Sequence, residues 1–246
     1  MGLKEKLAER RALLVPGAAN ALTARIIEDL GFEAIYLTGA GLANTSLGVP
    51  DIGLVTMTEL VETTAAISAA TALPLIVDGD TGFGNELNVV RTVRALERAG
   101  AAAIQLEDQV FPKKCGHFEG KGVIPAAEMV AKIRAAAEAR HSADFLLIAR
   151  TDARAIEGLD AAIERAARYA EAGADVTFVE APQSAEELAA IPRRLPLPQV
   201  ANMVFGGKTP VLGQKQLAAM GFSLVLYANA ALQASVLAMQ EVLAAL

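Results

Sequence analysis

The sequence predicts a single (β/α)8 barrel, a fold of about 250 residues. Short apolar runs recur along the chain, and each is followed by a loop and then by a helical pattern. The runs do not alternate between apolar and polar residues, which is typical of parallel strands that are buried on both faces. Eight such units, with no linker or low-complexity break between them, fill the 246 residues. A doubly wound parallel sheet is the alternative.

The eight expected strands cover residues 13–15, 34–37, 75–77, 103–106, 146–149, 176–179, 199–201 and 224–227. The helices between them have clear ends: residues 88–99 stop at Gly100 and residues 159–172 stop at Gly173, and glycine commonly follows a helix. The uncharged stretch 216–240 is divided by Gly221 and by Ala228-Asn229. We therefore expect a buried strand and helix there, and no membrane span.

Composition excludes several classes of protein. Hydrophobic residues make up 53% of the chain and the formal net charge is −6, so we expect a packed core and no nucleic-acid partner. One cysteine excludes an internal disulfide and is consistent with a reducing compartment. One cysteine and two histidines are too few for the usual structural zinc site. The mixed-charge N-terminus is no signal peptide, and we expect a soluble, cytoplasmic protein that binds no membrane.

Polar residues directly follow six successive expected strands. They are Thr38-Gly39, Asp78 with Asp80, Glu107-Asp108, Arg150-Thr151-Asp152, Glu180 and Asn202. A single Asp or Asn at such a position would be explained as a helix cap, but stability does not explain the whole set. In a (β/α)8 barrel the carboxyl ends of the strands form the mouth of the active site. The sequence therefore places an active site on this rim.

The carboxylates of the rim predict a divalent metal site. Asp78 and Asp80 are two positions apart, which puts both on one side of an extended segment, and Glu107 joins them from the next strand. Carboxylates so close together need a cation or a proton. With Asp51 and Glu180 also available, we expect Mg2+ held by oxygen ligands and water, with Mn2+ as the alternative. Taken alone, the glycine-rich segment around the two aspartates would be a turn.

The run Lys113-Lys114-Cys115-Gly116-His117 holds the only cysteine and one of the two histidines. Cationic neighbours make a thiol usable as an acid or a base. The alternative, an inert buried cysteine, fits poorly in a polar, loop-like stretch. Lys113, Lys114 and Arg150 are also candidates for binding anions, and the fork of Arg150 suits a carboxylate.

These segments resemble the isocitrate lyase/phosphoenolpyruvate mutase superfamily, from about Leu14 to the end of the chain. The motifs that carry the resemblance are Tyr36-Leu37-Thr38-Gly39, Ser46-Leu47-Gly48-Val49-Pro50-Asp51, Val77-Asp78-Gly79-Asp80-Thr81-Gly82-Phe83-Gly84, Glu107-Asp108-Gln109, the run 113–117, Ala149-Arg150-Thr151-Asp152-Ala153, Glu180-Ala181 and Asn202-Met203. The Lys-Lys-Cys-Gly-His run resembles the lyase branch, and within it the methylisocitrate lyases and dimethylmalate lyases.

The resemblance implies a Mg2+-dependent cleavage of a carbon–carbon bond. The substrate would be a 2-hydroxy di- or tricarboxylate of the 2-methylisocitrate or 2,3-dimethylmalate type, and the products a 2-oxoacid such as pyruvate and a carboxylate. Asp78 would contact the metal, while Asp51, Asp80 and Glu107 would hold its waters. Tyr36 would help to remove the hydroxyl proton.

Further roles follow from the same resemblance. Cys115 would protonate the enolate-like fragment as general acid, with Lys113, Lys114 and His117 beside it in the catalytic set. The segment 110–122 would be a lid that closes over the site. The substrate-binding residues would be Thr38, Gly39, Ala40, Gly116, Arg150, Glu180 and Asn202.

Two features depart from the family's pattern. Phe205 stands in a stretch where many relatives carry Glu, which leaves the distal group of the substrate open. The chain ends at Leu246, one helix after the eighth expected strand, whereas relatives commonly continue with helices that pack on a neighbouring subunit. A homo-oligomer is still expected, as a tetramer built from two dimers.

Other functions stay open at this point. A carboxyphosphonoenolpyruvate mutase or an oxaloacetate-processing enzyme would use the same scaffold. A non-catalytic barrel that binds a metabolite would keep the rim without turnover. Cys115 distinguishes the last case, because a binding protein has no need of a proton-donating thiol.

Overall fold

The structure, a computed structural model, describes residues 2–116 and 120–246. Within them, parallel strands form one eight-stranded sheet in the order β6-β5-β4-β3-β2-β1-β8-β7. The strands are β1 (Leu13–Ala18), β2 (Ile35–Leu37), β3 (Leu75–Asp78), β4 (Ala103–Glu107), β5 (Leu146–Thr151), β6 (Val176–Val179), β7 (Val200–Asn202) and β8 (Leu224–Tyr227). A parallel bridge between Thr177 and Gln199 links β6 to the segment before β7, so the sheet is nearly closed. The predicted (β/α)8 barrel is confirmed, and the open doubly wound sheet is wrong.

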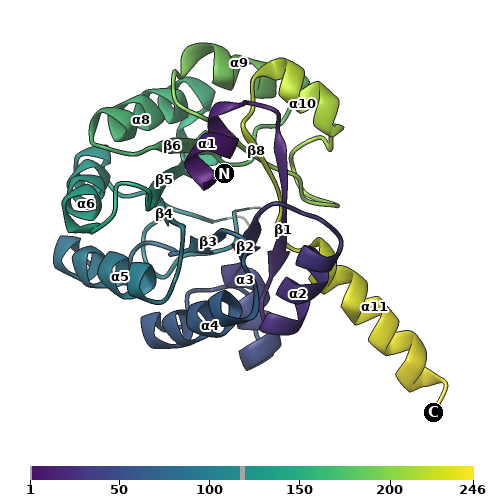
Figure 1. The fold of residues 1–246 in the computed structure, drawn as a ribbon. Coiled ribbons are helices and arrows are strands. Elements are labelled where there is room, and N and C mark those ends of the chain that lie inside the picture. Colours follow the sequence, from purple (N-terminus) through teal and green to yellow (C-terminus); the bar gives the residue numbers. More distant parts are fainter. Residues whose placement is uncertain (1, 117–119) are drawn as a thin grey trace.

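The described residues also form helices, most of which surround the sheet on its outer side (Figure 1). They are α1 (Leu3–Ala8), α2 (Ala21–Asp29), α3 (Gly39–Leu42), the π-helical η1 (Ala43–Leu47), α4 (Met57–Ala70), α5 (Glu86–Arg98), α6 (Ala126–Ala139), α7 (Arg154–Glu157), α8 (Leu159–Glu171), α9 (Ala185–Arg194), α10 (Gln214–Met220) and α11 (Ala230–Ala244). Side chains that accept backbone hydrogen bonds fix several helix starts. Asn20 accepts from Thr23 N and Asn85 from Leu87 N, which satisfies amides that have no partner within the helix.

The strands extend further than their apolar runs predict. β3 continues to Asp78, β4 to Glu107 and β5 to Thr151. Pairing of backbone groups explains this, because Asp78 stands opposite Gln105 and Glu107 opposite Arg150 in the parallel ladder. The polar side chains at the strand ends are therefore held by the sheet itself.

The interior of the barrel is apolar and is closed at one end by α1. Leu3 and Leu7 of this helix are buried against residues such as Leu13, Leu146 and Leu224, which begin their strands. Figure 1 shows α1 lying across the centre of the ring. The amino ends of the strands are thus sealed by apolar packing, and the polar carboxyl ends are left to form the functional face.

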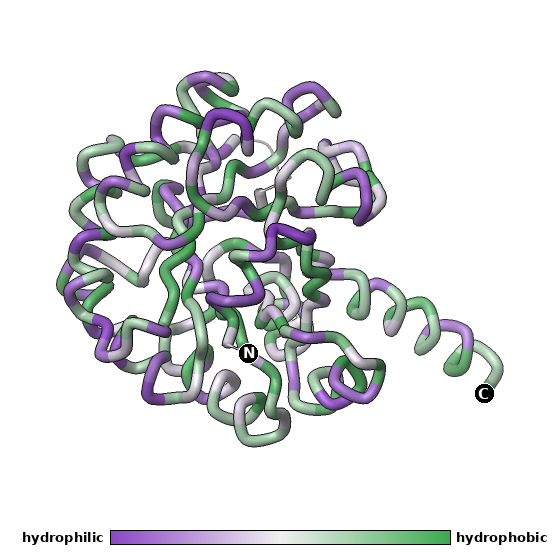
Figure 2. Tube along the Cα trace, turned by 45° about the horizontal axis from the view of Figure 1, so that its top comes forward, coloured by the Kyte–Doolittle hydropathy of each residue, from purple (hydrophilic) through white to green (hydrophobic). Residues whose placement is uncertain are grey.

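The C-terminal helix departs from the expectation of a buried strand and helix. β8 is buried, but α11 has no buried residue, and Figure 1 shows it projecting away from the barrel. Leu237, Val242 and Leu243 on this helix are 63%, 64% and 66% exposed, and Figure 2 shows apolar residues on its successive turns. An apolar surface of this kind predicts burial, but the described chain supplies nothing to cover it. No helix in the described residues is both long enough and apolar enough to cross a membrane.

The seal at the amino end predicts a stability effect. Leu7 is 1% exposed, so Leu7→Ala should lower the free energy of unfolding by about 2–5 kcal/mol, as expected for a buried leucine. Urea denaturation measures this change. Leu22→Ala on α2 is the matched control, because Leu22 is 72% exposed and its loss should change stability by no more than about 0.5 kcal/mol. Equal effects of the two substitutions would show that α1 does not seal the barrel.

Candidate active site

The carboxyl ends of the strands surround a cavity of about 50 Å³. Most of the predicted site residues contribute to its wall. These are Tyr36, Thr38, Ala40, Asp51, Asp78, Lys113, Cys115, Gly116, Arg150, Glu180 and Asn202. Side chains from seven separate parts of the chain therefore meet at one place, as the strand-end pattern predicts.

The cavity adjoins a wider groove of about 650 Å³ that opens to the outside. Ala40, Asp51, Cys115, Val204 and Asn229 belong to both. The groove is thus the route by which a small molecule could reach the cavity, and Cys115 lies at the boundary between the two.

Several predicted residues lie outside the cavity wall. Asp80 and Glu107 are buried behind it, and Gly39 donates its backbone N–H to Asp78 Oδ2 at 3.4 Å. The ammonium of Lys114 is directed to the carbonyl of Gly120, 3.1 Å away. His117 lies outside the described residues, so its predicted role stays a prediction.

Lys113 is not a solvated surface cation but the partner of buried carboxylates. Its side chain is 3% exposed, and Nζ lies 2.8 Å from Asp51 Oδ2 and 2.7 Å from Asp80 Oδ1. Burial opposes the charge of Lys113, but the surrounding carboxylates, Asp80 and Glu107 foremost, outweigh it and hold its pKa well above the usual value. The charge of Lys113 is thus engaged by carboxylates of the protein, and its expected role in binding a substrate anion stays a prediction.

Asp78 and Asp80 meet through a turn and not through an extended strand. β3 ends at Asp78, and Asp80 has a φ of 48°, in the left-handed region. The N–H of Asp80 donates to Asp78 Oδ1 at 3.3 Å, and Gln105 Nε2 donates to the same oxygen at 3.2 Å. The extended geometry assumed from the spacing is wrong, although the two carboxylates do lie together.

Glu107 supports a cation site in this cluster. Neither of its carboxylate oxygens accepts a hydrogen bond from a described residue, and Arg150 Nε lies 3.4 Å from Oε2. Burial, reinforced by Asp152 and Asp78, raises its pKa well above the usual value against the opposing charges of Arg150 and Lys113. A buried carboxylate with free acceptor capacity is a group that a cation would stabilise.

The donor set therefore fits a hard divalent cation held partly through water. Four carboxylates, from Asp51, Asp78, Asp80 and Glu107, gather around the single ammonium of Lys113. Across the described part of the chain, however, no three metal-ligating side chains converge on one point. A cation with few direct protein ligands and several bridging waters would be consistent both with the four nearby carboxylates and with the lack of a converging set of three ligands.

Arg150 is held in place by neighbouring side chains. Asp152 accepts from it twice, at 2.9 Å from Nε and at 3.1 Å from Nη2. Its guanidinium lies 5.3 Å from the centre of the Phe178 ring, and Nη1 lies 3.4 Å from Glu180 Oε2. Asn202 Nδ2 donates to the same Glu180 oxygen at 3.3 Å. The cation is thus held rigidly at the cavity wall, where it can bind a carboxylate.

Tyr36 and Cys115 complete the chemical groups of the cavity. Tyr36 is 2% exposed, and burial together with the charge of Asp78 raises the pKa of its hydroxyl well above the usual value, so the phenol is neutral here. The backbone N–H of Cys115 donates to the carbonyl of Asp51 at 3.2 Å. This contact ties the thiol-bearing segment to the carboxylate cluster.

Sequence reasoning missed three residues at this site. Asn229 lines the cavity and accepts from the hydroxyl of Thr38 at 3.2 Å. It follows the eighth strand, so the strand-end rule that identified its neighbours could have found it. Phe178, beneath Arg150, and Gln105, beside Asp78, lie within strands. The sequence does not show which side chains of a strand point toward the site, so these two residues could not be identified from it.

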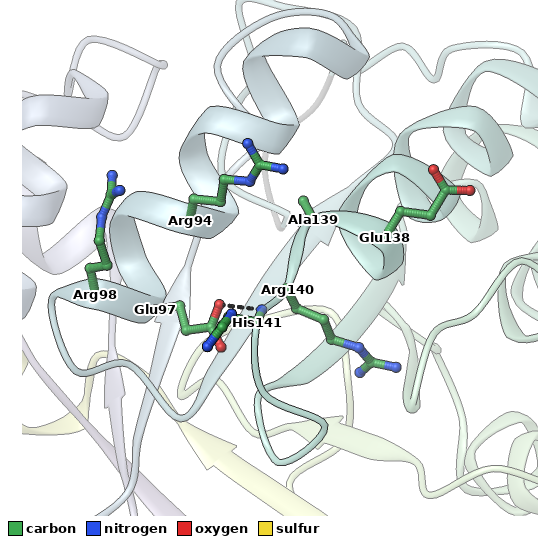
Figure 3. Close-up of a pocket in the computed structure, with 7 residues that line it drawn as sticks. All are labelled: Arg94, Glu97, Arg98, Glu138, Ala139, Arg140 and His141. Atoms are coloured by element: carbon green, nitrogen blue, oxygen red, sulfur yellow. Dashed lines mark hydrogen bonds between the residues drawn. The ribbon is translucent and has the colours of Figure 1, made fainter.

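A larger pocket, of about 680 Å³, lies away from this site between the C-terminal ends of α5 and α6 (Figure 3). These ends lead into β4 and β5, so the pocket is at the opposite end of the barrel. The carboxylate of Glu97 accepts from the backbone N–H groups of His141 and Ser142 at 2.7 and 2.6 Å. None of the predicted site residues lines this pocket.

Comparisons with known proteins find relatives along nearly the whole chain. The family profile described as phosphoenolpyruvate phosphomutase matches residues 3–246. The 2,3-dimethylmalate lyase of Eubacterium barkeri is 48% identical over 244 residues, which are 99% of this chain and 84% of that protein. The 2-methylisocitrate lyase of Aeropyrum pernix is 48% identical over 241 residues, which are 98% of this chain and 77% of that protein.

A solved structure of oxaloacetate acetylhydrolase with the inhibitor 3,3-difluorooxalacetate superposes with a TM-score of 0.95. The sequences are 36% identical, and the match covers 98% of this chain and 84% of that one. Both the fold and the sequence are thus shared along nearly the whole chain. The chain belongs to the phosphoenolpyruvate mutase/isocitrate lyase superfamily, and its relatives identify it as a carbon–carbon lyase.

Proposed function

We propose that this lyase cleaves a 2-hydroxy di- or tricarboxylate of the 2,3-dimethylmalate or 2-methylisocitrate type, giving a 2-oxoacid such as pyruvate and a carboxylate. The observation that carries the proposal is one cavity in which the Arg150 guanidinium, the Asp78 carboxylate and Cys115 meet. A cation that binds carboxylate, a cluster that suits a divalent metal and a thiol are the groups that this reaction needs. The similarity to two proteins named as lyases supports the same conclusion.

Mg2+ is the proposed cofactor, with Mn2+ as the alternative. Asp78 would contact it, and Asp51, Asp80 and Glu107 would hold its waters. When bound, it would polarise the hydroxyl and carboxylate of the substrate as a Lewis acid.

Residues of the chain would bind the substrate and transfer its protons. Arg150 holds and orients a substrate carboxylate, with Asn202, Glu180 and the backbone of residues 38–40 around it. The neutral phenol of Tyr36 helps to remove the proton of the 2-hydroxyl group as a relay, taking up that proton while it passes its own to the carboxylate of Asp78. The hydroxyl oxygen becomes the ketone oxygen of the 2-oxoacid. The electron pair of the broken carbon–carbon bond stays on the departing fragment, and Cys115 delivers a proton to that carbon.

The segment 110–122 is the proposed lid, and residues 117–119 within it lie outside the described part of the chain. Lys113, Cys115 and Gly116 of this segment line the cavity, and about 50 Å³ leaves room for only one or two waters. A branched dicarboxylate cannot enter such a space unless the wall moves. Opening of this segment would admit the substrate from the groove, and closure would exclude water.

The composition of the groove favours an apolar distal group on the substrate. Val49, Pro50, Val204 and Phe205 line it, and no Lys or Arg is among its described lining residues. Phe205 is 57% exposed and faces Tyr227 with ring centres 6.0 Å apart. A third carboxylate would find no cation there, so we favour a dimethylmalate-type dicarboxylate over a tricarboxylate.

A homo-oligomer, predicted as a tetramer of two dimers, is also proposed. The uncovered apolar side chains of α11 support it, because a second copy of the chain could cover them.

The substrate assignment predicts the outcome of a panel assay. Purified protein with Mg2+ should release pyruvate from 2,3-dimethylmalate with a higher kcat/KM than from 2-methylisocitrate, as measured by coupled oxidation of NADH. Oxaloacetate belongs in the same panel, because of the similarity to oxaloacetate acetylhydrolase. Release of oxalate and acetate from oxaloacetate, with no pyruvate from either hydroxy acid, would replace the lyase assignment by oxaloacetate hydrolysis.

Cys115 should be required for turnover and not for folding. Cys115→Ser keeps the shape of the side chain but makes a much weaker acid, so kcat should fall by at least about 10²-fold, as is usual when a general acid is lost. The melting temperature should stay unchanged, because the side chain is only partly buried. A variant with near-normal kcat would rule out Cys115 as the proton donor.

A divalent metal should be required, through Asp78. Dialysis against a chelator should abolish pyruvate release, and Mg2+ should restore it. Asp78→Asn should stay inactive at any Mg2+ concentration and should lose the metal-dependent rise in melting temperature expected for the wild type. Full activity in excess chelator would mean that the carboxylate cluster serves another purpose.

A further inference from the structure

Lys121 makes a buried bridge between the proposed lid and the barrel. Its Nζ lies 2.6 Å from Asp152 Oδ1 and also donates to the backbone carbonyl of Gly116. The side chains of Lys121 and Asp152 are 2% and 0% exposed. Lys121 does not line the cavity. Its ammonium therefore pairs with groups of the protein and is not placed to contact a substrate there.

Asp152 is shared by two cations. Its carboxylate holds Arg150 through two hydrogen bonds, and its Oδ1 receives both Arg150 Nη2 and Lys121 Nζ. Burial alone would raise the pKa of Asp152, but the charges of Arg150 and Lys121 hold it below the usual value. Its backbone N–H donates to Asp108 Oδ1 at 2.9 Å, which fixes the residue at the end of β5. Asp152 is therefore a rigid, ionised anchor.

Gly116 lies directly against the residue that Asp152 orients. A Cβ atom at this position would stand 2.3 Å from Arg150 Nη2 and 2.8 Å from Glu180 Cγ, so only glycine fits. The carbonyl of Gly116 is bound by Lys121, and the N–H of the preceding Cys115 is bound by Asp51. The position of Cys115 over the cavity thus depends on contacts on both sides of it.

We propose that Lys121 is a positioning residue that latches residues 115–116 in the closed position, with Asp152 as the anchor shared with Arg150. The inference rests on the proposed lid but not on the identity of the substrate. If Lys121 leaves Asp152, the Gly116 carbonyl loses its donor and Asp152 keeps one cation of two. Closure of residues 115–116 and the orientation of Arg150 are then coupled, because both depend on the carboxylate of Asp152.

The test uses the thiol of Cys115, which is the only cysteine of the chain. Its reaction with an aromatic disulfide reagent is followed by absorbance in the free protein. Lys121→Met keeps the apolar stem but removes the charge, and it should speed labelling about tenfold, the order expected for loss of a charge-assisted hydrogen bond. With Mg2+ and oxalate as a probe, the wild type should be protected further, and Lys121→Met much less.

Two further variants separate positioning from general stability. Lys121→Arg should recover most of the slow labelling, because its guanidinium can reach the same acceptors. Lys215→Met, on the exposed surface of α10, is the matched control and should label like the wild type. In an Asp152→Asn background, Lys121→Met should add little, since the anchor is already lost.

The outcomes decide the proposal without a known substrate. A lower melting temperature in Lys121→Met with an unchanged labelling rate would show a merely structural role and would overturn the latch. Equal labelling of wild type and Lys121→Met would overturn it as well. Where the panel assay finds a substrate, Lys121→Met should lower kcat more than it raises KM. A wild type without lyase activity would refute the proposed function, while the labelling difference would still support the latch.

Discussion

An excess of buried carboxylates at the carboxyl ends of the strands is the constraint on which the other features depend. Buried charges are unfavourable unless they are paired, and here the described carboxylates outnumber the cations that face them. The carboxylates are those of Asp51, Asp78, Asp80, Glu107, Asp152 and Glu180, and the cations are Lys113, Lys121 and Arg150. Two of these cations come from one loop. The loop thereby neutralises part of the negative charge at the rim, and the proposed Mg2+ would balance part of what remains.

The barrel and its network of hydrogen bonds hold these buried carboxylates in place. α1 seals the amino ends with apolar contacts, so the polar groups have one face on which to gather. Asp108 then secures the end of β5, since its carboxylate accepts from Thr151 Oγ1 at 2.7 Å, Tyr169 Oη at 2.8 Å and the Asp152 N–H at 2.9 Å. A fully bonded network of this kind is rigid. Arg150 and Asp152 are thereby positioned by groups that never touch the cavity.

The sequence predicts the barrel and most of its rim because both depend on local patterns. An apolar run marks a strand, and a polar residue after it marks the functional end. The pattern does not reveal what depends on packing between distant segments. It does not reveal that the ammonium of Lys113 lies between Asp51 and Asp80. It also makes the segment of Asp80 extended, whereas Asp80 has a left-handed backbone conformation in a turn. It predicts that α11 is buried. The periodicity of apolar residues indicates that a helix has an apolar face, but it does not show whether other residues of the same chain pack against that face.

The charge balance also links the proposed metal to the proposed lid. Lys113 on the loop engages Asp51 and Asp80, the oxygens that would hold waters around a divalent ion. A cation arriving in the cluster would weaken the attraction of these carboxylates for the Lys113 ammonium, and movement of the loop would equally change the affinity of the cluster for the cation. Lys121 is attached to Asp152 instead, which lies on the Arg150 side of the cavity. Binding of the proposed metal would thus loosen the Lys113 end of the loop, while the Lys121 end would stay attached to Asp152 beside Arg150.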